Sequence, residues 1–110
     1  MSRKEAIEKV LRSLGVNRTL TGYDITIEAL NRVLDDREYL LMRTKALYPE
    51  IAEKFKTTIY AAERNIRTCS RRAYTTNPEL LQKMAGYPIK KVPPVGEFLD
   101  ILAGFIERSM

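Results

Sequence analysis

The feature that most constrains the fold of this chain is a helical periodicity, seen most clearly over residues 57–74, TTIYAAERNIRTCSRRAY. Apolar residues recur there three or four positions apart, the spacing of one face of an α-helix. The same stretch contains four arginines and one glutamate, a net charge of +3 against +5 for the whole chain. We predict a helix over about residues 58–74 with a cationic outer face and an inner face made of Ile59, Ala62, Ile66, Cys69 and Ala73.

Capping signals divide the rest of the chain into further helices, with no convincing strand. Ser2 and Glu5 have the spacing of a capping box, and Gly15 stands where that first helix would end. Thr21 and Asp24 repeat the capping-box spacing and predict a second helix. The remaining predicted elements are helices over Arg37–Leu47 and Pro49–Phe55, one from Asn77-Pro78-Glu79 to Gly86, an extended loop over Tyr87–Gly96, and a last helix over Glu97–Arg108.

The size and composition predict a single all-α domain of about six helices over residues 1–110. The chain has 110 residues, of which 45% are hydrophobic and 30% charged, as in ordinary globular domains. No apolar run approaches the roughly 20 residues of a membrane span, and the N-terminus lacks the apolar stretch of a signal peptide. A single cysteine excludes an internal disulfide. We therefore expect a cytoplasmic protein without membrane contact.

The side chains needed for enzyme chemistry are missing. The chain has no histidine, the commonest general base and metal ligand, and so no imidazole to activate Cys69. Asp35 and Asp36 are adjacent and would point in different directions on a helix, so they are expected to be solvated and not a catalytic pair. We expect no enzyme activity, no cofactor and no metal site, and we interpret Cys69 as a small buried core residue.

The segment before the cationic helix, LYPEIAEKFKTT at residues 47–58, completes a helix-turn-helix outline. Ile51 and Ala52 would face inward from a short helix, and a tight turn at Lys56-Thr57 would follow. Either Thr57 or Thr58 can cap the next helix with its side-chain oxygen. That helix would be about 25 Å long at 1.5 Å per residue, enough to lie in a major groove.

The charged residues near the start of this helix suit contacts with base edges. Arginine donates two hydrogen bonds to guanine, and a carboxylate accepts one from the cytosine amino group. The adjacent pair Glu63-Arg64 is therefore a candidate for contacting neighbouring bases. The alternative is an ion pair within the helix, from Glu63 to Arg67, worth about 0.3–0.5 kcal/mol on a solvated face.

These motifs resemble the C-terminal effector domain of the sporulation response regulator family, stage 0 sporulation protein A. The resemblance runs from about residue 14 to residue 106. It is carried by LGV at 14–16 and GY at 22–23, LYPEIAEKFKTT at 47–58, ERNIR at 63–67, AGY at 85–87 and GEFLDILA at 96–103.

The resemblance implies a six-helix domain with a helix-turn-helix and no winged helix, which binds a short double-stranded DNA box and regulates transcription with RNA polymerase. The polymerase sigma subunit is an implied partner, as is self-association on tandem boxes. Base contacts are expected from Glu63, Arg64 and Arg67. Contacts with the DNA backbone are expected from Thr57, Thr58, Tyr60, Thr68, Arg71, Lys90 and Lys91, the two lysines on grounds of charge.

The chain departs from the family pattern at several positions. Ala61 replaces an arginine and Thr68 a histidine, and the segment Thr19–Tyr23 lacks the histidine and lysine usual there. The preferred DNA box is therefore not set by the resemblance. No alternating βα pattern precedes Ser2, and no phosphoacceptor aspartate can be assigned. We expect a chain without a receiver domain, not switched by its own aspartyl phosphorylation.

A helical protein-interaction module is the alternative function, with the basic face binding an acidic partner. The last helix would then offer a docking surface, unless its apolar residues are simply core. Structured RNA is a weaker alternative, because one arginine-bearing helix without exposed aromatic residues suits it poorly. The apolar residues in question are Phe98, Leu102, Phe105 and Ile106.

Overall fold

The computed structural model describes all 110 residues, and every regular element in it is helical. This confirms the predicted all-α class and the number of six α-helices. In chain order the elements are α1 (Arg3–Ser13), α2 (Gly22–Asp35), a 3₁₀-helix η1 (Arg37–Leu40), a π-helix η2 (Arg43–Leu47), α3 (Tyr48–Lys54), α4 (Ile59–Thr76), α5 (Pro78–Ala85) and α6 (Val95–Ser109).

Most of the predicted helix ends are confirmed. The Ser2 hydroxyl accepts a hydrogen bond from the backbone N–H of Glu5, and the Glu5 carboxylate accepts one from the N–H of Ser2, both at 3.1 Å. Asn77 caps α5 by accepting from the N–H of Leu80 at 3.2 Å. Gly15 and Gly86 follow α1 and α5 in the left-handed conformation, with φ of +83° and +82°, which glycine adopts without steric cost.

The predicted capping box at the start of α2 is wrong. Thr21 has a helical backbone and makes no capping hydrogen bond with its side chain. A turn precedes the helix, and the carbonyl of Leu20 accepts from the N–H of Tyr23 at 3.1 Å. Asp24 instead accepts from Arg18 at 2.8 Å. Backbone and loop groups therefore take the place of the expected side-chain cap.

The predicted helix over Arg37–Leu47 is also wrong, because the chain breaks at Leu41 and Met42 into η1 and η2. Met42 has a non-helical backbone, with φ of −122° and ψ of 41°. Leu41 is 87% exposed, so its apolar side chain does not anchor a core-facing stripe. Arg43 donates to the carbonyl of Leu40, an acceptor that a continuous helix would have used internally. The π-helix then runs directly into α3.

The last helix begins two residues earlier than predicted, at Val95, so Gly96 belongs to the helix and not to the loop. A Cβ added to Gly96 would lie 2.4 Å from Nη1 of Arg43. Glycine at this position therefore leaves room for the arginine side chain from η2. The remaining loop, from Gly86 to Pro94, has the extended character that its prolines predicted.

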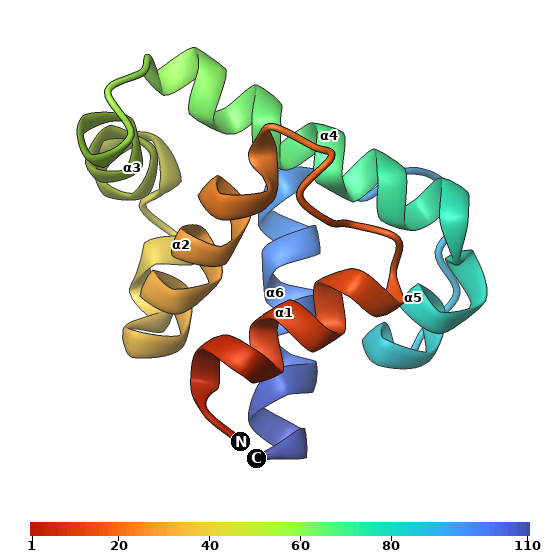
Figure 1. The fold of residues 1–110 in the computed structure, drawn as a ribbon. Helices are drawn as coiled ribbons and strands as arrows, with labels where there is room; N and C mark the ends of the chain where they lie inside the picture. The colour runs from red at the N-terminus through yellow and green to blue at the C-terminus, as the bar shows by residue number, and fades with distance from the viewer.

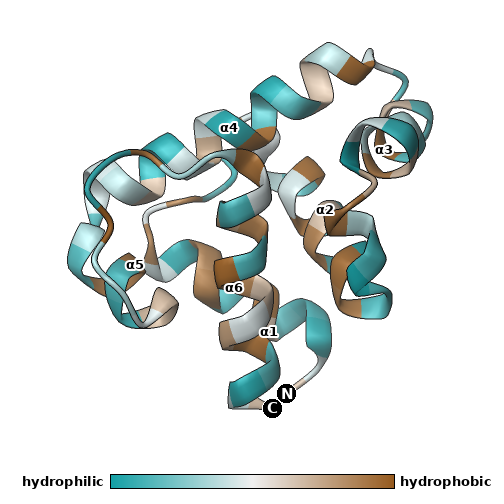
Figure 2. Ribbon diagram, turned by 180° about the vertical axis from the view of Figure 1, so that it is seen from behind, coloured by the Kyte–Doolittle hydropathy of each residue, from teal (hydrophilic) through white to brown (hydrophobic).

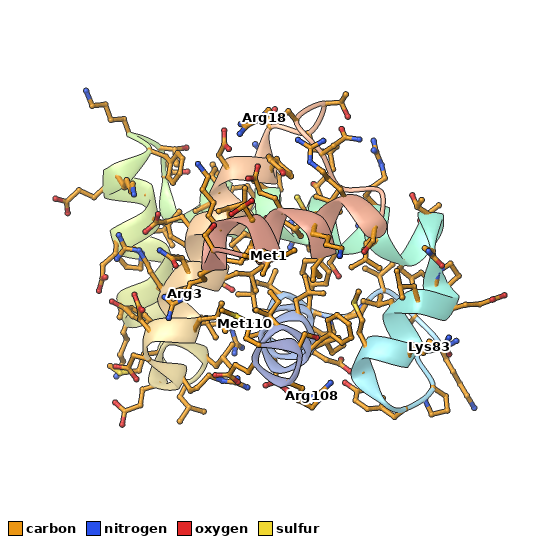
Figure 3. All side chains as sticks on the ribbon, turned by 60° about the horizontal axis from the view of Figure 1, so that its bottom comes forward. Met1, Arg3, Arg18, Lys83, Arg108 and Met110 are labelled. Atoms are coloured by element: carbon orange, nitrogen blue, oxygen red, sulfur yellow. The ribbon has the colours of Figure 1, made fainter.

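Helix α6 lies in the middle of the molecule, with α1, α2, α4 and α5 packed around it (Figure 1). A cluster of 27 buried residues forms the core. Helix α4 crosses one end of the molecule, and the two termini lie together at the opposite end (Figure 1). Figure 3, with the terminal end turned forward, shows Lys83 and Arg18 at the edge of the molecule.

No helix has both the length and the apolar composition that crossing a membrane requires.

Candidate nucleic-acid interface

The turn between α3 and α4 has a well-defined geometry. Lys56 has a positive φ of 54°, the one non-glycine residue in this conformation. The N–H of Thr57 bonds to the carbonyl of Ala52 at 2.9 Å, and that of Lys56 to Glu53 at 3.3 Å, the pattern of a Schellman motif. Thr58, and not Thr57, caps α4, its hydroxyl accepting from the N–H of Ala61 at 2.9 Å. These bonds fix the direction in which α4 leaves the turn.

The inner face of α4 is buried as predicted, with one exception. Ala62, Ile66, Cys69 and Ala73 are fully buried, and burial raises the pKa of the Cys69 thiol. Ile59 was expected on this face but is 44% exposed. It is the first residue of α4, where the helix extends past the core and above α3 (Figure 1).

The outer face of α4 is accessible in part. Arg64, Thr68 and Arg71 are exposed, whereas Glu63 and Arg67 are half-buried. Tyr60 is 66% exposed, so the expectation that this helix lacks exposed aromatic residues is wrong. Figure 2 shows polar residues predominating along the side of α4 that faces away from the core.

Two of the predicted base-contacting arginines each interact with a residue four positions earlier. The guanidinium carbon of Arg64 lies over the ring of Tyr60, 5.4 Å from its centroid. Nη1 of Arg67 lies 3.1 Å from a carboxylate oxygen of Glu63, so the intrahelical ion pair considered from the sequence is formed. The two arginines therefore differ electrostatically, because the Glu63 carboxylate compensates the charge of Arg67, whereas the aromatic partner leaves that of Arg64 uncompensated.

Tyr48 of α3 and Arg43 of η2 are electrostatically linked to this ion pair. Tyr48 of α3 is buried, and burial is the main reason why the pKa of its hydroxyl is raised. The charge of Glu63 raises this pKa further, whereas the charges of Arg43 and Arg67 lower it. The charges of Arg43, Glu63 and Arg67 therefore all act on the Tyr48 hydroxyl. Sequence reasoning missed both residues, since Tyr48 and Arg43 belong to elements whose packing against α4 carries no local signal.

The loop between α5 and α6 runs alongside α4 (Figure 2). Two of its residues, Lys90 and Lys91, are exposed. The buried hydroxyl of Ser70, on α4, donates to the carbonyl of Pro93 at 2.8 Å. The N–H of Ile89 donates to the side chain of Gln82, also at 2.8 Å. Sequence reasoning did not single out Ser70, a residue that joins this loop directly to α4.

At the beginning of this loop the Tyr87 hydroxyl donates to Glu97 at 2.6 Å. This hydrogen bond to a carboxylate is the main reason why the pKa of Tyr87 is raised to about 12. Tyr87 is therefore protonated throughout the physiological range, and the bond closes the loop onto the first turn of α6.

On its other side α4 is approached by the loop between α1 and α2 (Figure 1). A Cβ on Gly22 would lie 2.4 Å from the backbone oxygen of Asn65, so the glycine allows α2 to begin directly against α4. Nη1 of Arg72 donates to the carbonyl of Gly15 at 3.2 Å. Arg72 is therefore part of the scaffold and does not contribute to the cationic outer face of α4.

An ion-pair network fixes α3 against α2. Arg32 pairs with Glu28 at 2.7 Å and with Glu50, and Lys54 pairs with Glu28 at 2.8 Å. The Tyr39 hydroxyl also donates to Glu50 at 2.6 Å. The helix that precedes the turn is thereby fixed in position by α2 and η1.

The docking surface expected on the last helix in the alternative function is not available. Phe98, Leu102 and Ile106 are buried, and only Phe105 is partly accessible. These residues form core.

Residues 7–106 match the family described as sporulation initiation factor Spo0A, C terminal. This match covers all the elements described above except the two ends of the chain. The chain belongs to this family. Spo0A C-terminal domains are helical, DNA-binding effector domains of response regulators that control transcription in sporulation, and this confirms the family resemblance. This Spo0A-type domain therefore binds DNA, and the exposed face of α4 is its candidate DNA-binding surface.

Proposed function

We propose that α4 is the recognition helix of this domain and that it lies in the major groove of a specific double-stranded DNA box. Glu63, Arg64 and Arg67 contact base edges. The observation that carries the proposal is the position of these three side chains, one exposed and two half-buried, on the outer face of a helix whose opposite face is core. With 18 residues, α4 is about 27 Å long at 1.5 Å per residue, sufficient to follow the groove.

The contacts with the DNA backbone come from both ends of this face. Thr57, Thr58 and Tyr60 lie at the start of α4, with Thr68 and Arg71 farther along it. The Thr58 hydroxyl accepts from Ala61 but retains its own proton for a phosphate oxygen. Lys90 and Lys91 would contact phosphates beside the groove, because the hydrogen bond from Ser70 keeps their loop next to α4.

Self-association on tandem boxes and contact with the RNA polymerase sigma subunit belong to the same proposal. Their support is the family membership. Self-association is tested after binding is established, by asking whether two adjoining boxes bind more tightly than their separate affinities predict.

Selection of bound duplexes from a random pool tests the proposal. We expect a short common motif, and an affinity that decreases with salt by about 0.9 log units per log unit of salt for each phosphate contacted. Arg64→Ala should cost about 1–3 kcal/mol and relax selectivity at one base pair.

A flat salt response, or selected duplexes without a common motif, would contradict the proposal. The protein-interaction alternative predicts a different result: a partner retained by the chain after nuclease treatment, and lost when the arginines of α4 are replaced.

A further inference from the structure

Tyr60 is an exposed aromatic residue on the first turn of α4 and is not part of the core. Its side chain is more exposed than that of any other aromatic residue in the chain. Exposure of a large ring on the proposed DNA-facing side has no structural explanation within the fold. It calls for a role in what this surface does.

The ring of Tyr60 contacts one residue that the proposed function uses, Arg64, at the helical spacing i,i+4. An aromatic face attracts a guanidinium through its quadrupole and accepts no conventional hydrogen bond. The five N–H donors of Arg64 therefore stay available, which a forked contact with guanine requires.

The neighbouring pair provides the contrast within the same helix. Arg67 also has a partner four residues earlier, but Glu63 is an acid and accepts a hydrogen bond from Nη1 of the guanidinium at 3.4 Å. Arg67 must exchange this hydrogen bond for one with a base, whereas Arg64 gives up none. Arg64 is thus restricted by its partner before DNA binds, and all its N–H groups remain free to donate to a base.

We propose that Tyr60 is a positioning residue for Arg64, and that its ring sets the selectivity at the base pair that Arg64 contacts. The inference rests on the proposed base contact of Arg64. It is separable from the backbone contact proposed for Tyr60, because the ring positions the arginine and the hydroxyl contacts the phosphate. Restricting a flexible side chain before binding reduces the entropy lost on binding.

The test uses Tyr60→Phe, Tyr60→Leu and Arg64→Ala in the whole chain. The probes are the duplex selected from the random pool and its three versions changed at the base pair where Arg64→Ala relaxes selectivity. The readout is the ratio of affinities between selected and changed duplexes. Tyr60→Phe should keep this ratio, even where loss of the hydroxyl weakens all four duplexes equally. Tyr60→Leu should lower the ratio about two- to fivefold, as expected for an exposed cation–π contact, and should have no effect in the Arg64→Ala background.

A ratio that falls equally in Tyr60→Phe and Tyr60→Leu, or one unaffected by either, would overturn the inference. So would a Tyr60→Leu effect that persists without Arg64.

NMR relaxation of the Arg64 Nε–H in the free protein separates this failure from that of the proposed function. The N–H should be restricted in the wild type and in Tyr60→Phe and mobile in Tyr60→Leu, and equal mobility in all three would refute positioning regardless of DNA. If the wild type selects no duplex, the proposed function fails as well.

Discussion

At the scale of single residues, the pairing of Glu63 with Arg67 sets a balance between attraction to any DNA and preference for one sequence. In the free chain the carboxylate compensates one of the cations on the outer face of α4. It would also repel phosphates close to it. Contact with a specific partner on the DNA, such as the amino group of cytosine, would offset this repulsion.

Glu63→Ala should therefore raise affinity for an unrelated duplex severalfold while reducing discrimination at one base pair by about 1–3 kcal/mol. The freed Arg67 guanidinium explains the first effect and the lost acceptor explains the second. Titration of the selected duplex, its single-base variants and an unrelated duplex at one salt concentration measures both. Glu107→Ala, with the same charge change near the termini, is the matched control. Equal weakening of every duplex would show that Glu63 acts through the fold and not through a base.

At the scale of elements, the distance between α2 and α4 depends on Gly22. The Cβ of an alanine there would lie within van der Waals overlap of the Asn65 backbone oxygen, and backbone cannot move aside as a side chain can. Gly104, inside α6, faces only the flexible end of Arg108, at 3.2 Å.

The same substitution should therefore have opposite effects at the two positions. Gly22→Ala should lower the free energy of unfolding by about 1–3 kcal/mol through overpacking. Gly104→Ala should raise it by about 0.5–1 kcal/mol, because alanine is the better helix former and the arginine can shift. Urea denaturation of both variants measures the two changes. A loss of similar size at both sites would mean that helix packing, and not the Asn65 contact, limits Gly22.

What could be predicted from the sequence followed from local interactions. The capping box at Ser2 and the start of α5 at Asn77-Pro78 involve residues three positions apart, so sequence spacing specifies them. The break at Met42 and the exposure of Ile59 depend on where the core ends, which no short window contains.

The same distinction applies to the candidate site. The outer face of α4 follows from helical periodicity, and its candidate base contacts were identified in this way. The contacts that hold α4 in place could not be predicted, because each joins residues far apart in the chain. They are Ser70 with Pro93, Arg72 with Gly15, and Gly22 with Asn65. A serine or a glycine in a helix carries no sign of such a partner.

At the scale of the whole molecule, the ion-pair network between α2 and α3 makes stability depend on pH. Burial of Glu28 by itself would raise its pKa, but hydrogen bonds from Lys54 and Arg32 outweigh this effect and lower the pKa below its ordinary value of 4.5. A carboxylate with a lower pKa in the folded chain stabilises the fold above its unfolded pKa. That contribution is lost as the pH falls through the folded value.

The wild type should therefore lose more stability than Glu28→Gln when the pH is lowered from 7 to below 4.5, although Glu28→Gln is less stable at neutral pH. Urea denaturation at a series of pH values measures the difference, with Glu38→Gln as a control for an exposed glutamate in η1. Parallel pH curves for wild type and Glu28→Gln would exclude Glu28 as the source of acid sensitivity.

The charge of the molecule is distributed so that DNA affinity should depend on where a cation lies, and not on the total of +5 alone. Arg71, Lys90 and Lys91 are the proposed phosphate contacts that carry charge. Arg71 lies on α4, at the end of the molecule opposite the termini, and the lysines lie on the loop that is bonded to α4 through Ser70 and Pro93. Each neutralised phosphate releases condensed counterions, contributing about −0.9 to the slope of log affinity against log salt.

Lys90→Ala and Lys91→Ala should each make that slope shallower by about 0.9. Both should weaken every duplex to a similar extent, since phosphates carry no sequence information. Lys4→Ala, an equal charge change at the terminal end of α1, should leave the slope unchanged. If it changed the slope as much as Lys90→Ala, the salt dependence would report net charge, and the loop beside α4 would have no special part in binding.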